Sequence, residues 1–423
     1  MKKVLLLAYH YPPLGGVAVM RVLRFSRYLA KFGWEATVLC VEGGSKNEPR
    51  DETLLNEIPD GIAIERVKCL EPDNFADTWE IPKEKIVRNL FKTFDRVLFP
   101  DDRALWVKPV TRRAVSLIKS KNIDVVWATA QPWSTLVAAR DIKRTTSTPL
   151  VLDFRDDWTT SNADFRKVKK LHREQALEQS VLREADAVVS VTPHIVEQLQ
   201  ARAPENLSHQ DFHYIPNGFD PAHFQLQERP NTESFDIVHT GGLYHLRPIG
   251  SFLTVLDHWF TAQPDRVGQV KVKLAGRITD ENRKAIDASP WKERVEILGF
   301  VDHQTVRKLI TTSAVNLLMI EQVKTAPWLF TGKVFEYIGA RRPILMLGPN
   351  PSPLATLLSS TGLGHISAYK NPQETAEVLE SLYKAHKNNE TTCDDSQIEL
   401  YNAENQTADL AKILEEVCSN GQN

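Results

Sequence analysis

The 423-residue sequence contains no long hydrophobic run. The apolar stretch near its start, residues 4–8, is shorter than the roughly 7–15 apolar residues of a signal-peptide core, and no segment approaches the roughly 20 of a membrane-spanning helix. These absences exclude an integral membrane protein. We interpret residues 4–8 as a buried first β-strand and expect a cytoplasmic protein.

The sequence also lacks excess charge and clustered cysteines. Its formal net charge of -2 provides no basic field for nucleic acid. The four cysteines lie far apart without metal-ligand spacing, which predicts reduced thiols: Cys40, Cys69, Cys393 and Cys418. No G-x-G-x-x-G segment is present, which disfavours a dinucleotide site of the dehydrogenase kind. No D-x-D pair stands at a strand end, so we expect neither a metal nor a cofactor.

The chain does contain a regular alternation of short apolar runs and helical periodicity, which is typical of parallel α/β sheets. Its length exceeds one ordinary core and suits two domains of roughly 200 residues each. The predicted strands of the first half are residues 4–8, 36–41, 62–67, 125–130, 149–154, 187–192 and 212–217. Those of the second half are residues 236–240, 270–275, 295–300, 315–320 and 343–348. We predict two Rossmann-like domains facing a central cleft.

The boundary between these domains follows from composition. Residues 219–234 are polar, hold two prolines and show no period, so they read as a linker between residues 1–218 and residues 235–400. Within residues 401–423 the segment TADLAKILEEVC is amphipathic. We expect this last helix to pack back on the first domain.

Two strand-to-helix turns contain paired glycines. Gly15 and Gly16 follow the first strand, whereas Gly241 and Gly242 follow the strand at residues 236–240, with Arg247 close behind. Glycine lets the backbone approach a ligand, and a guanidinium forms paired hydrogen bonds with phosphate oxygens. The alternative is a tight turn and a surface arginine without a ligand. We predict donor-binding roles for the glycines and a catalytic role for Arg247.

The segment TGKVFEYIGARRPILMLG, residues 331–348, begins a helix that places Lys333 and Glu336 one turn apart. The N-terminus of this helix is expected at the carboxyl edge of the sheet, where open α/β sheets bind ligands. Lys333 would then meet a phosphate and Glu336 two hydroxyls of a ribose, with Gly332 and Val334 beside them in the donor site. The alternative is a surface ion pair.

Three charged residues lie at the carboxyl end of the predicted strand at residues 149–154: Asp153, Arg155 and Asp156. Carboxylates around an arginine at a strand end are costly unless they bind something or pair together. We predict a catalytic role in orienting an acceptor hydroxyl. A helix-capping network is the alternative.

Seven segments in order carry a resemblance to the GT-B glycosyltransferases, most closely to the retaining family 4 enzymes: PPLGG, DFRDDW, EADAVVSVTP, IPNGFD, HTGGLY, VEILGFVDHQTVRKLI and GKVFEYIGARRPIL. The resemblance implies a nucleotide-sugar donor on the second domain and an acceptor on the first. It also implies that Phe300 and Val301 meet the base. The two glutamates that the family spaces eight residues apart fall at Trp328 and Glu336, so only the ribose-binding one is present.

The usual phosphate-binding residues of the family are altered as well. Its arginine falls at Gly242 and its lysine is replaced by Arg247, so Lys333 is the candidate for the missing cation. The resemblance predicts an enzyme that transfers a sugar from a nucleotide-diphosphate-sugar to a carbohydrate or lipid-linked acceptor, in surface polysaccharide or glycan biosynthesis, with retention. The alternatives are a nucleotide-sugar epimerase on the same fold and a non-catalytic sugar-nucleotide binding protein.

Residues 80–121 hold eleven Lys and Arg against five Asp and Glu, a balance of +6, with aromatic residues between them. Basic and aromatic residues together suit the headgroup layer of an anionic membrane. This segment predicts either a peripheral site on the inner face of the membrane or a solvated helical insertion.

Overall fold

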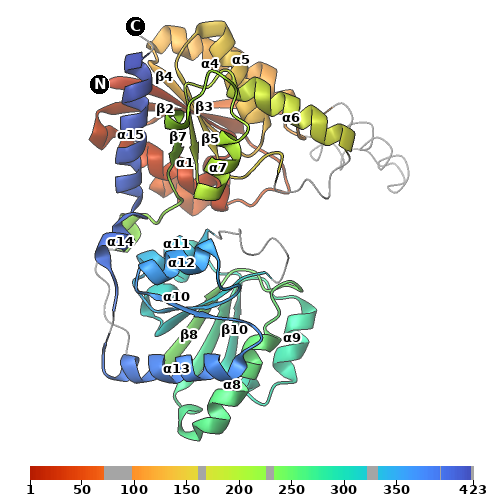
Figure 1. Ribbon diagram of the computed structural model, residues 1–423, viewed down its shortest axis with the longest axis vertical. Coiled ribbons are helices and arrows are strands. Elements are labelled where there is room, and N and C mark those ends of the chain that lie inside the picture. Colours follow the sequence, from red (N-terminus) through yellow and green to blue (C-terminus); the bar gives the residue numbers. More distant parts are fainter. Residues whose placement is uncertain (71–97, 161–167, 225–232, 322–331, 391, 421–423) are drawn as a thin grey trace. The chain divides into compact units, whose positions relative to one another are not determined.

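The computed structural model describes residues 1–70, 98–160, 168–224, 233–321, 332–390 and 392–420 (Figure 1). The chain forms two compact units. The first unit comprises Met1–Asn217 together with Ala403–Asn423, and the second comprises Gly218–Asn402. Each unit contains one sheet in which all the paired strands run parallel.

The described strands of the first unit pair in the order β3-β2-β1-β4-β5-β6-β7. Residues 4–7 of the central strand are fully buried, as expected for a strand covered on both faces. The strands are β1 (Lys2–Ala8), β2 (Trp34–Glu42), β3 (Ala63–Lys68), β4 (Val125–Ala130), β5 (Leu150–Phe154), β6 (Ala187–Ser190) and β7 (Phe212–Tyr214).

Helices cover this sheet on both faces. They are α1 (Val17–Tyr28), α4 (Val107–Lys121), α5 (Ser134–Thr146), α6 (Val168–Leu182), α7 (Pro193–Gln200) and α15 (Ala403–Asn420), with short 3-10 turns at η1 (Leu29–Phe32), η2 (Glu52–Glu57), η3 (Ala104–Trp106) and η5 (His209–Asp211). The C-terminal helix α15 packs beside α1 (Figure 1). Leu410, Leu414 and Val417 lie on one helical face and join the core of the first unit.

The second unit pairs its described strands in the order β10-β9-β8-β11-β12-β13. Successive residues of a strand point to opposite faces, so Ile237 and Leu317 join one core while Val238 and Leu318 join the other. The strands are β8 (Phe235–Thr240), β9 (Val270–Ala275), β10 (Val295–Gly299), β11 (Val315–Met319), β12 (Ile344–Leu347) and β13 (Gly364–Ser367).

The two cores of this unit separate its helices. Helices α8 and α13 supply one core, and α10, α11 and α12 supply the other. The helices are α8 (Gly250–Ala262), α9 (Asp280–Asp287), α10 (His303–Thr312), α11 (Lys333–Gly339), α12 (Pro353–Ser360), α13 (Pro372–Lys387) and α14 (Asp395–Glu399), with 3-10 turns η6 (Pro221–His223), η7 (Pro264–Arg266) and η8 (Lys292–Arg294).

The two predicted parallel α/β sheets are therefore confirmed. The segment predicted as a linker begins inside the second unit, because Phe219 is buried in its core beside η6. Residues 225–232 of that segment lie outside the described residues, as do residues 80–97 of the basic segment and Trp328. No helix among the described residues is long and apolar enough to span a membrane.

Candidate functional site

Three glycines mark the carboxyl ends of three adjacent strands in the second unit. The N–H of Gly241, after β8, donates to the carbonyl of Ala275 at 2.6 Å, and the N–H of Gly276, after β9, donates to the carbonyl of Gly299 at 2.6 Å. A Cβ on Gly276 would lie 2.3 Å from the carbonyl oxygen of Gly241. The strand ends therefore approach so closely that no side chain fits between them.

Lys333 lies directly against this glycine turn. A Cβ added to Gly241 would lie 2.1 Å from Nζ of Lys333, and Gly241 has a φ of 101°. Burial and the nearby Arg247 guanidinium lower the pKa of Lys333 to about 8, although Glu336 opposes the shift. Among the described residues no carboxylate forms an ion pair with Lys333. A desolvated ammonium without a counter-ion is costly, which points to an anionic ligand.

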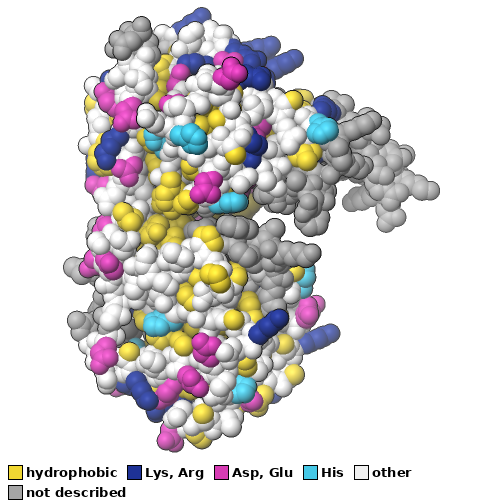
Figure 2. All heavy atoms as spheres, in the orientation of Figure 1, with side chains coloured by type: hydrophobic (Ala, Val, Ile, Leu, Met, Phe, Trp, Pro, Cys, Tyr) yellow, Lys and Arg dark blue, Asp and Glu magenta, His cyan; other side chains and the backbone are white. Residues whose placement is uncertain are grey.

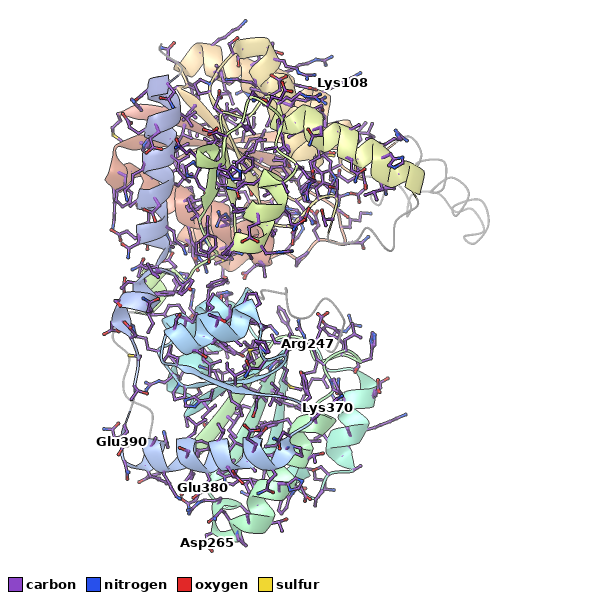
Figure 3. The ribbon with its side chains drawn as sticks, viewed as in Figure 1. Lys108, Arg247, Asp265, Lys370, Glu380 and Glu390 are labelled. Atoms are coloured by element: carbon purple, nitrogen blue, oxygen red, sulfur yellow. The ribbon has the colours of Figure 1, made fainter. Side chains whose placement is uncertain are left out.

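Arg247 is the second cation at this edge (Figure 3). Its Nη2 lies 3.0 Å from Oε1 of Glu321, and its guanidinium carbon lies 5.0 Å from the centre of the Tyr244 ring. The Tyr244 hydroxyl also donates to Oε1 of Glu321. The Arg247 side chain is only 11% exposed, and its Nε is buried without a hydrogen-bond partner among the described residues. One donor of this guanidinium is therefore left unsatisfied by the described part of the fold.

Two buried side chains fix β8 beneath these cations. His239 bonds through Nδ1 to the carbonyl of Leu317 at 2.8 Å, so Nδ1 carries the proton. Burial and the Lys333 charge lower the pKa of His239 to about 3, which keeps the ring neutral. From α11 the Tyr337 hydroxyl accepts from the N–H of Thr240 at 2.9 Å. These bonds hold the Gly241 turn in register with Lys333, four residues before Tyr337.

The other predicted donor residues occupy different positions. Glu336 pairs with Nε2 of His303 on α10 at 3.1 Å. Phe300, directly after β10, is 92% exposed, and Val301 is half-buried. The Val334 side chain lies in the hydrophobic core, so only its backbone is left for a ligand. Gly332 precedes the first residue of α11.

Gly242 leaves open space where the family would place an arginine. The nearest atom to a Cβ added there is 3.7 Å away, which is ordinary contact. A Cβ at this position would therefore be tolerated without moving the turn.

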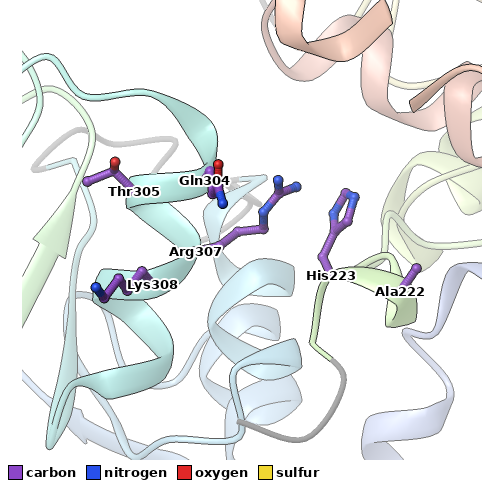
Figure 4. A pocket seen from close by; sticks show the side chains of 6 residues that line it. All are labelled: Ala222, His223, Gln304, Thr305, Arg307 and Lys308. Atoms are coloured by element: carbon purple, nitrogen blue, oxygen red, sulfur yellow. The ribbon is translucent and has the colours of Figure 1, made fainter. Parts of the chain in front are cut away.

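A polar cavity of about 520 Å³ lies near the His303 end of this site (Figure 4). Arg307 points across it toward His223, and the ring of His223 lies 6.5 Å from that of His303. Its remaining lining residues are Ala222, Gln304, Thr305 and Lys308. The sequence analysis did not predict this cavity, because η6 and α10 lie about eighty residues apart in the chain.

The predicted glycine turn of the first unit is held by its own backbone. The N–H of Gly15 donates to the carbonyl of Pro49 at 2.8 Å, and Gly16, with a φ of 86°, caps α1. A Cβ on Gly15 would lie 3.2 Å from Cβ of Asp51. Gly15 therefore serves the packing of this loop against residues 49–51, and its N–H is not open to a ligand.

Asp153 is also satisfied internally. It is fully buried, and its carboxylate accepts from Nη2 of Arg21 at 2.7 Å and from the Thr129 hydroxyl at 2.6 Å. Arg21 in turn donates to the carbonyl of Pro216 at 3.0 Å. This ion pair ties α1 to β5 and satisfies the Asp153 carboxylate inside the fold, so a direct contact of Asp153 with an acceptor stays a prediction.

Arg155 and Asp156 differ from each other in exposure. Arg155 donates to the carbonyls of Ala130, Ala18 and Gln131, and burial lowers its pKa. Its guanidinium therefore holds the end of β4 and the loop after it. Asp156 is exposed and accepts from Nε2 of Gln131 at 3.2 Å. Partial desolvation of its carboxyl group raises the pKa of Asp156, although the nearby Arg155 opposes the shift.

Sequence analysis missed a buried polar cluster at the end of β1. Oε1 of Glu48 lies 3.2 Å from Nε2 of His10 and 3.1 Å from Nη2 of Arg103. Burial opposes ionisation of Glu48, but His10 and Arg103 outweigh it and lower the pKa of this carboxyl. All three partners come from separate segments, so local sequence carries no signal for the cluster.

Within the described ranges, no group of three His, Cys, Asp or Glu side chains is arranged to hold a metal ion. All four cysteines are free thiols. The chemistry on offer in the second unit is therefore anion binding by two cations beside a glycine turn.

Comparison with known proteins relates this chain to a family of glycosyltransferases. Residues 14–223 match the sequence model of Glycosyltransferase Family 4. No curated protein matches the chain in sequence. Several solved structures share its fold at low identity.

The α,α-trehalose-phosphate synthase (UDP-forming) from Burkholderia vietnamiensis has a TM-score of 0.61 at 9% identity, over 98% of this chain and 100% of its own. A trehalose-6-phosphate structure from E. coli bound with UDP-2-fluoro glucose has a TM-score of 0.59 at 11% identity, over 98% and 99%. The N-terminal domain of a Candida albicans trehalose-6-phosphate phosphatase has a TM-score of 0.60 at 11% identity, over 99% and 97%. The matched segment and the shared two-sheet fold identify the chain as a glycosyltransferase of the GT-B fold, related to Glycosyltransferase Family 4 through residues 14–223.

Proposed function

We propose that this glycosyltransferase moves a sugar from a nucleotide-diphosphate-sugar to a carbohydrate or lipid-linked acceptor, with retention, in the synthesis of a surface polysaccharide or glycan. The observation that carries the proposal is the Lys333 ammonium, which lies against the Gly241 turn without a carboxylate partner among the described residues. A diphosphate supplies the missing negative charge. The matched family and the nucleotide-containing neighbour support a donor of this class.

The leaving diphosphate gains charge as the bond to the sugar breaks. Cations already fixed in a water-poor site stabilise that charge without reorganising, and losing one such group typically costs roughly 10²–10³ in rate. Lys333 and Arg247 are placed for this task by α11 and by the turn after β8. The ribose is assigned to Glu336 and the base to the exposed Phe300, at the β10 side of the sheet.

The acceptor is assigned to the first unit, where Asp156 offers an exposed carboxylate at the end of β5. Such a group accepts hydrogen bonds from hydroxyls. Asp153 and Arg155 would support Asp156 by holding the surrounding loops rather than by touching the acceptor.

The experiment that tests the proposal is incubation of the protein with a panel of labelled nucleotide sugars, with and without carbohydrate and lipid-linked acceptors. Transfer, or slow hydrolysis of the donor without an acceptor, is the expected result. An epimerised donor would identify an epimerase instead, and tight binding without any turnover would identify a binding protein. The anomeric configuration of the product decides whether transfer retains it.

We also propose that α4 docks the protein on an anionic membrane. Lys108, Arg112 and Lys119 are spaced four and seven residues apart, so they share one helical face. All three are exposed, and none forms an ion pair with a described residue. Figure 2 shows Lys and Arg side chains gathered over the end of the first unit that carries Lys108 (Figure 3).

Flotation with vesicles containing anionic lipid tests this surface. The triple variant Lys108→Ala, Arg112→Ala, Lys119→Ala should lose binding at low salt. A variant that removes the same charge from α9 and η8 of the second unit, Arg283→Ala, Lys284→Ala, Lys292→Ala, should keep it. Binding should also weaken as salt rises, because screening shortens the reach of exposed charges. Equal flotation of both variants would contradict the α4 assignment.

A further inference from the structure

Glu321 follows β11 at the carboxyl edge of the second unit, and only one of its two carboxylate oxygens is bonded within the described residues. Its Oε1 accepts from Nη2 of Arg247 at 3.0 Å and from the Tyr244 hydroxyl. Its Oε2 accepts no hydrogen bond from any residue in the described part of the chain. The side chain is 22% exposed, so part of the Glu321 side chain faces solvent.

A carboxylate at this place needs an explanation, because it stands next to the cations assigned to a diphosphate. Its negative charge opposes the binding of that anion. Holding Arg247 requires only one neutral acceptor oxygen, which a glutamine would supply without repulsion. An ionised carboxylate is purely an acceptor of hydrogen bonds, so the free oxygen suits a ligand that brings hydrogen-bond donors.

The strand order indicates which part of the donor comes nearest. Two residues are assigned to the nucleoside. Phe300 directly follows β10, at one edge of the sheet, and Glu336 on α11 contacts His303 at the start of α10. Arg247 follows β8, two strands in from β10, and Glu321 follows β11, three strands in. A donor that runs from β10 toward β11 therefore brings its diphosphate to Lys333 and Arg247, and the sugar beyond it to Glu321.

We propose that Glu321 is a specificity residue that accepts a hydrogen bond from a hydroxyl of the transferred sugar and rejects sugars that carry a carboxylate. This inference rests on the proposed function. A hydroxylated sugar satisfies the open oxygen, whereas a uronate places a second negative charge against it and leaves it without a donor. Specificity of this kind arises from repulsion of the wrong ligand as much as from attraction of the right one.

The test compares donors that differ only in this group: UDP-glucose with UDP-glucuronate, and GDP-mannose with GDP-mannuronate, each against the free nucleoside diphosphate. The protein should bind the neutral member of its preferred pair at least about tenfold more tightly than the acidic member, the size of a charge-assisted hydrogen bond. In Glu321→Gln that ratio should fall to within about threefold. Affinity for the free nucleoside diphosphate, which has no sugar, should fall much less or rise.

The matched control is Glu380→Gln on α13, which lies apart from Arg247 in the second unit (Figure 3). Glu380 also holds an arginine through Oε1, with Nη2 of Arg266 at 3.0 Å. Its variant should keep the wild-type ratio.

Three outcomes would overturn the inference. An unchanged ratio in Glu321→Gln, with every ligand weakened equally, would show that Glu321 only positions Arg247. A preference of the wild type for the acidic donor would reverse the assignment. If the wild type binds none of the nucleotides, the proposed function fails together with the inference, and that result is distinct from the other two.

Discussion

The carboxyl edges of the two sheets differ in whether their buried charged side chains have partners of opposite charge. In the first unit the buried charges are matched inside the fold: Asp153 pairs with Arg21, and Glu48 pairs with Arg103. In the second unit Lys333 lies against a glycine turn with no described carboxylate as its partner, and Arg247 keeps one buried donor unused. The same kind of edge therefore serves structure in one unit and leaves charge unsatisfied in the other.

This difference separates stability from function. A matched buried pair costs little while both partners are present, but removing one partner leaves an uncompensated charge. An unpaired buried cation already destabilises the free protein. Binding of an anion relieves this destabilisation. Substitutions in the first unit should thus act on folding, whereas substitutions in the second should act on donor binding and turnover.

The largest expected effect is on stability. Asp153→Ala leaves the Arg21 guanidinium buried without its carboxylate, which should lower the free energy of unfolding of the first unit by about 3–5 kcal/mol. Urea titration followed by tryptophan fluorescence measures it. The exposed neighbour provides the control, because Asp156→Ala should change stability by less than about 0.5 kcal/mol. Equal stability of the two variants would remove the contrast between the units.

The next effect is on turnover. Lys333→Ala should reduce the transfer rate by roughly 10²–10³ with little change in folding, because the cation stabilises charge that grows in the transition state. Arg247→Ala should act in the same direction, and the double variant should fall short of the product of the two effects because both cations serve one anion. Steady-state kinetics with a saturating acceptor measure these rates, with Lys284→Ala on α9 as the control. Full activity of Lys333→Ala would contradict the claim that the unpaired charge of the second unit serves catalysis.

A smaller effect is expected on donor binding at the ribose position. Glu336→Gln loses charge-assisted hydrogen bonds to two hydroxyls, which should weaken donor binding by about 1.5–3 kcal/mol. Calorimetric titration of the nucleotide sugar measures it. The 2′,3′-dideoxy nucleotide lacks both hydroxyls, so the variant and the wild type should bind it alike. A loss of the same size with the dideoxy compound would place Glu336 elsewhere in the site.

The pH dependence gives the smallest effect. Lys333 in the free protein has its pKa lowered to about 8, and a bound diphosphate raises it again because the anion favours the ammonium. Donor affinity should therefore be greatest below pH 8 and should fall by up to about tenfold per pH unit above it, since binding must then include uptake of a proton. Dissociation constants measured from pH 7 to pH 10 check this. Lys333→Arg should lack the fall in affinity that begins near pH 8.

The fold could be predicted because its signal is local. Short buried runs such as residues 4–8 and 315–320 are bounded by turn residues and separated by amphipathic stretches, and each became a parallel strand. The start of the helix at Lys333 followed in the same way from the Gly332 turn. Local pattern also predicted where charged side chains stand relative to a strand end.

Local pattern could not predict which charges meet. Asp153 and Arg21 are 132 residues apart in the chain, so DFRDDW looked like an open site although its first carboxylate is buried and paired. Gly241 and Lys333 were both predicted as site residues, but their contact depends on how α11 packs against β8. No sequence motif marked Glu321. Its proposed role depends on its contact with Arg247, which follows the neighbouring strand β8.

The central claim is that Lys333, which has no described carboxylate partner in the free protein, binds the diphosphate of the donor. Proton uptake on binding tests this claim most directly. Calorimetric titration of a nucleotide sugar at pH 8, repeated in buffers with different ionisation enthalpies, counts the protons taken up on binding. Nucleotide sugars do not themselves titrate near this pH, so the account predicts uptake of about half a proton by the wild type. Lys333→Arg should take up none. Tight binding by the wild type with no proton uptake would contradict the account.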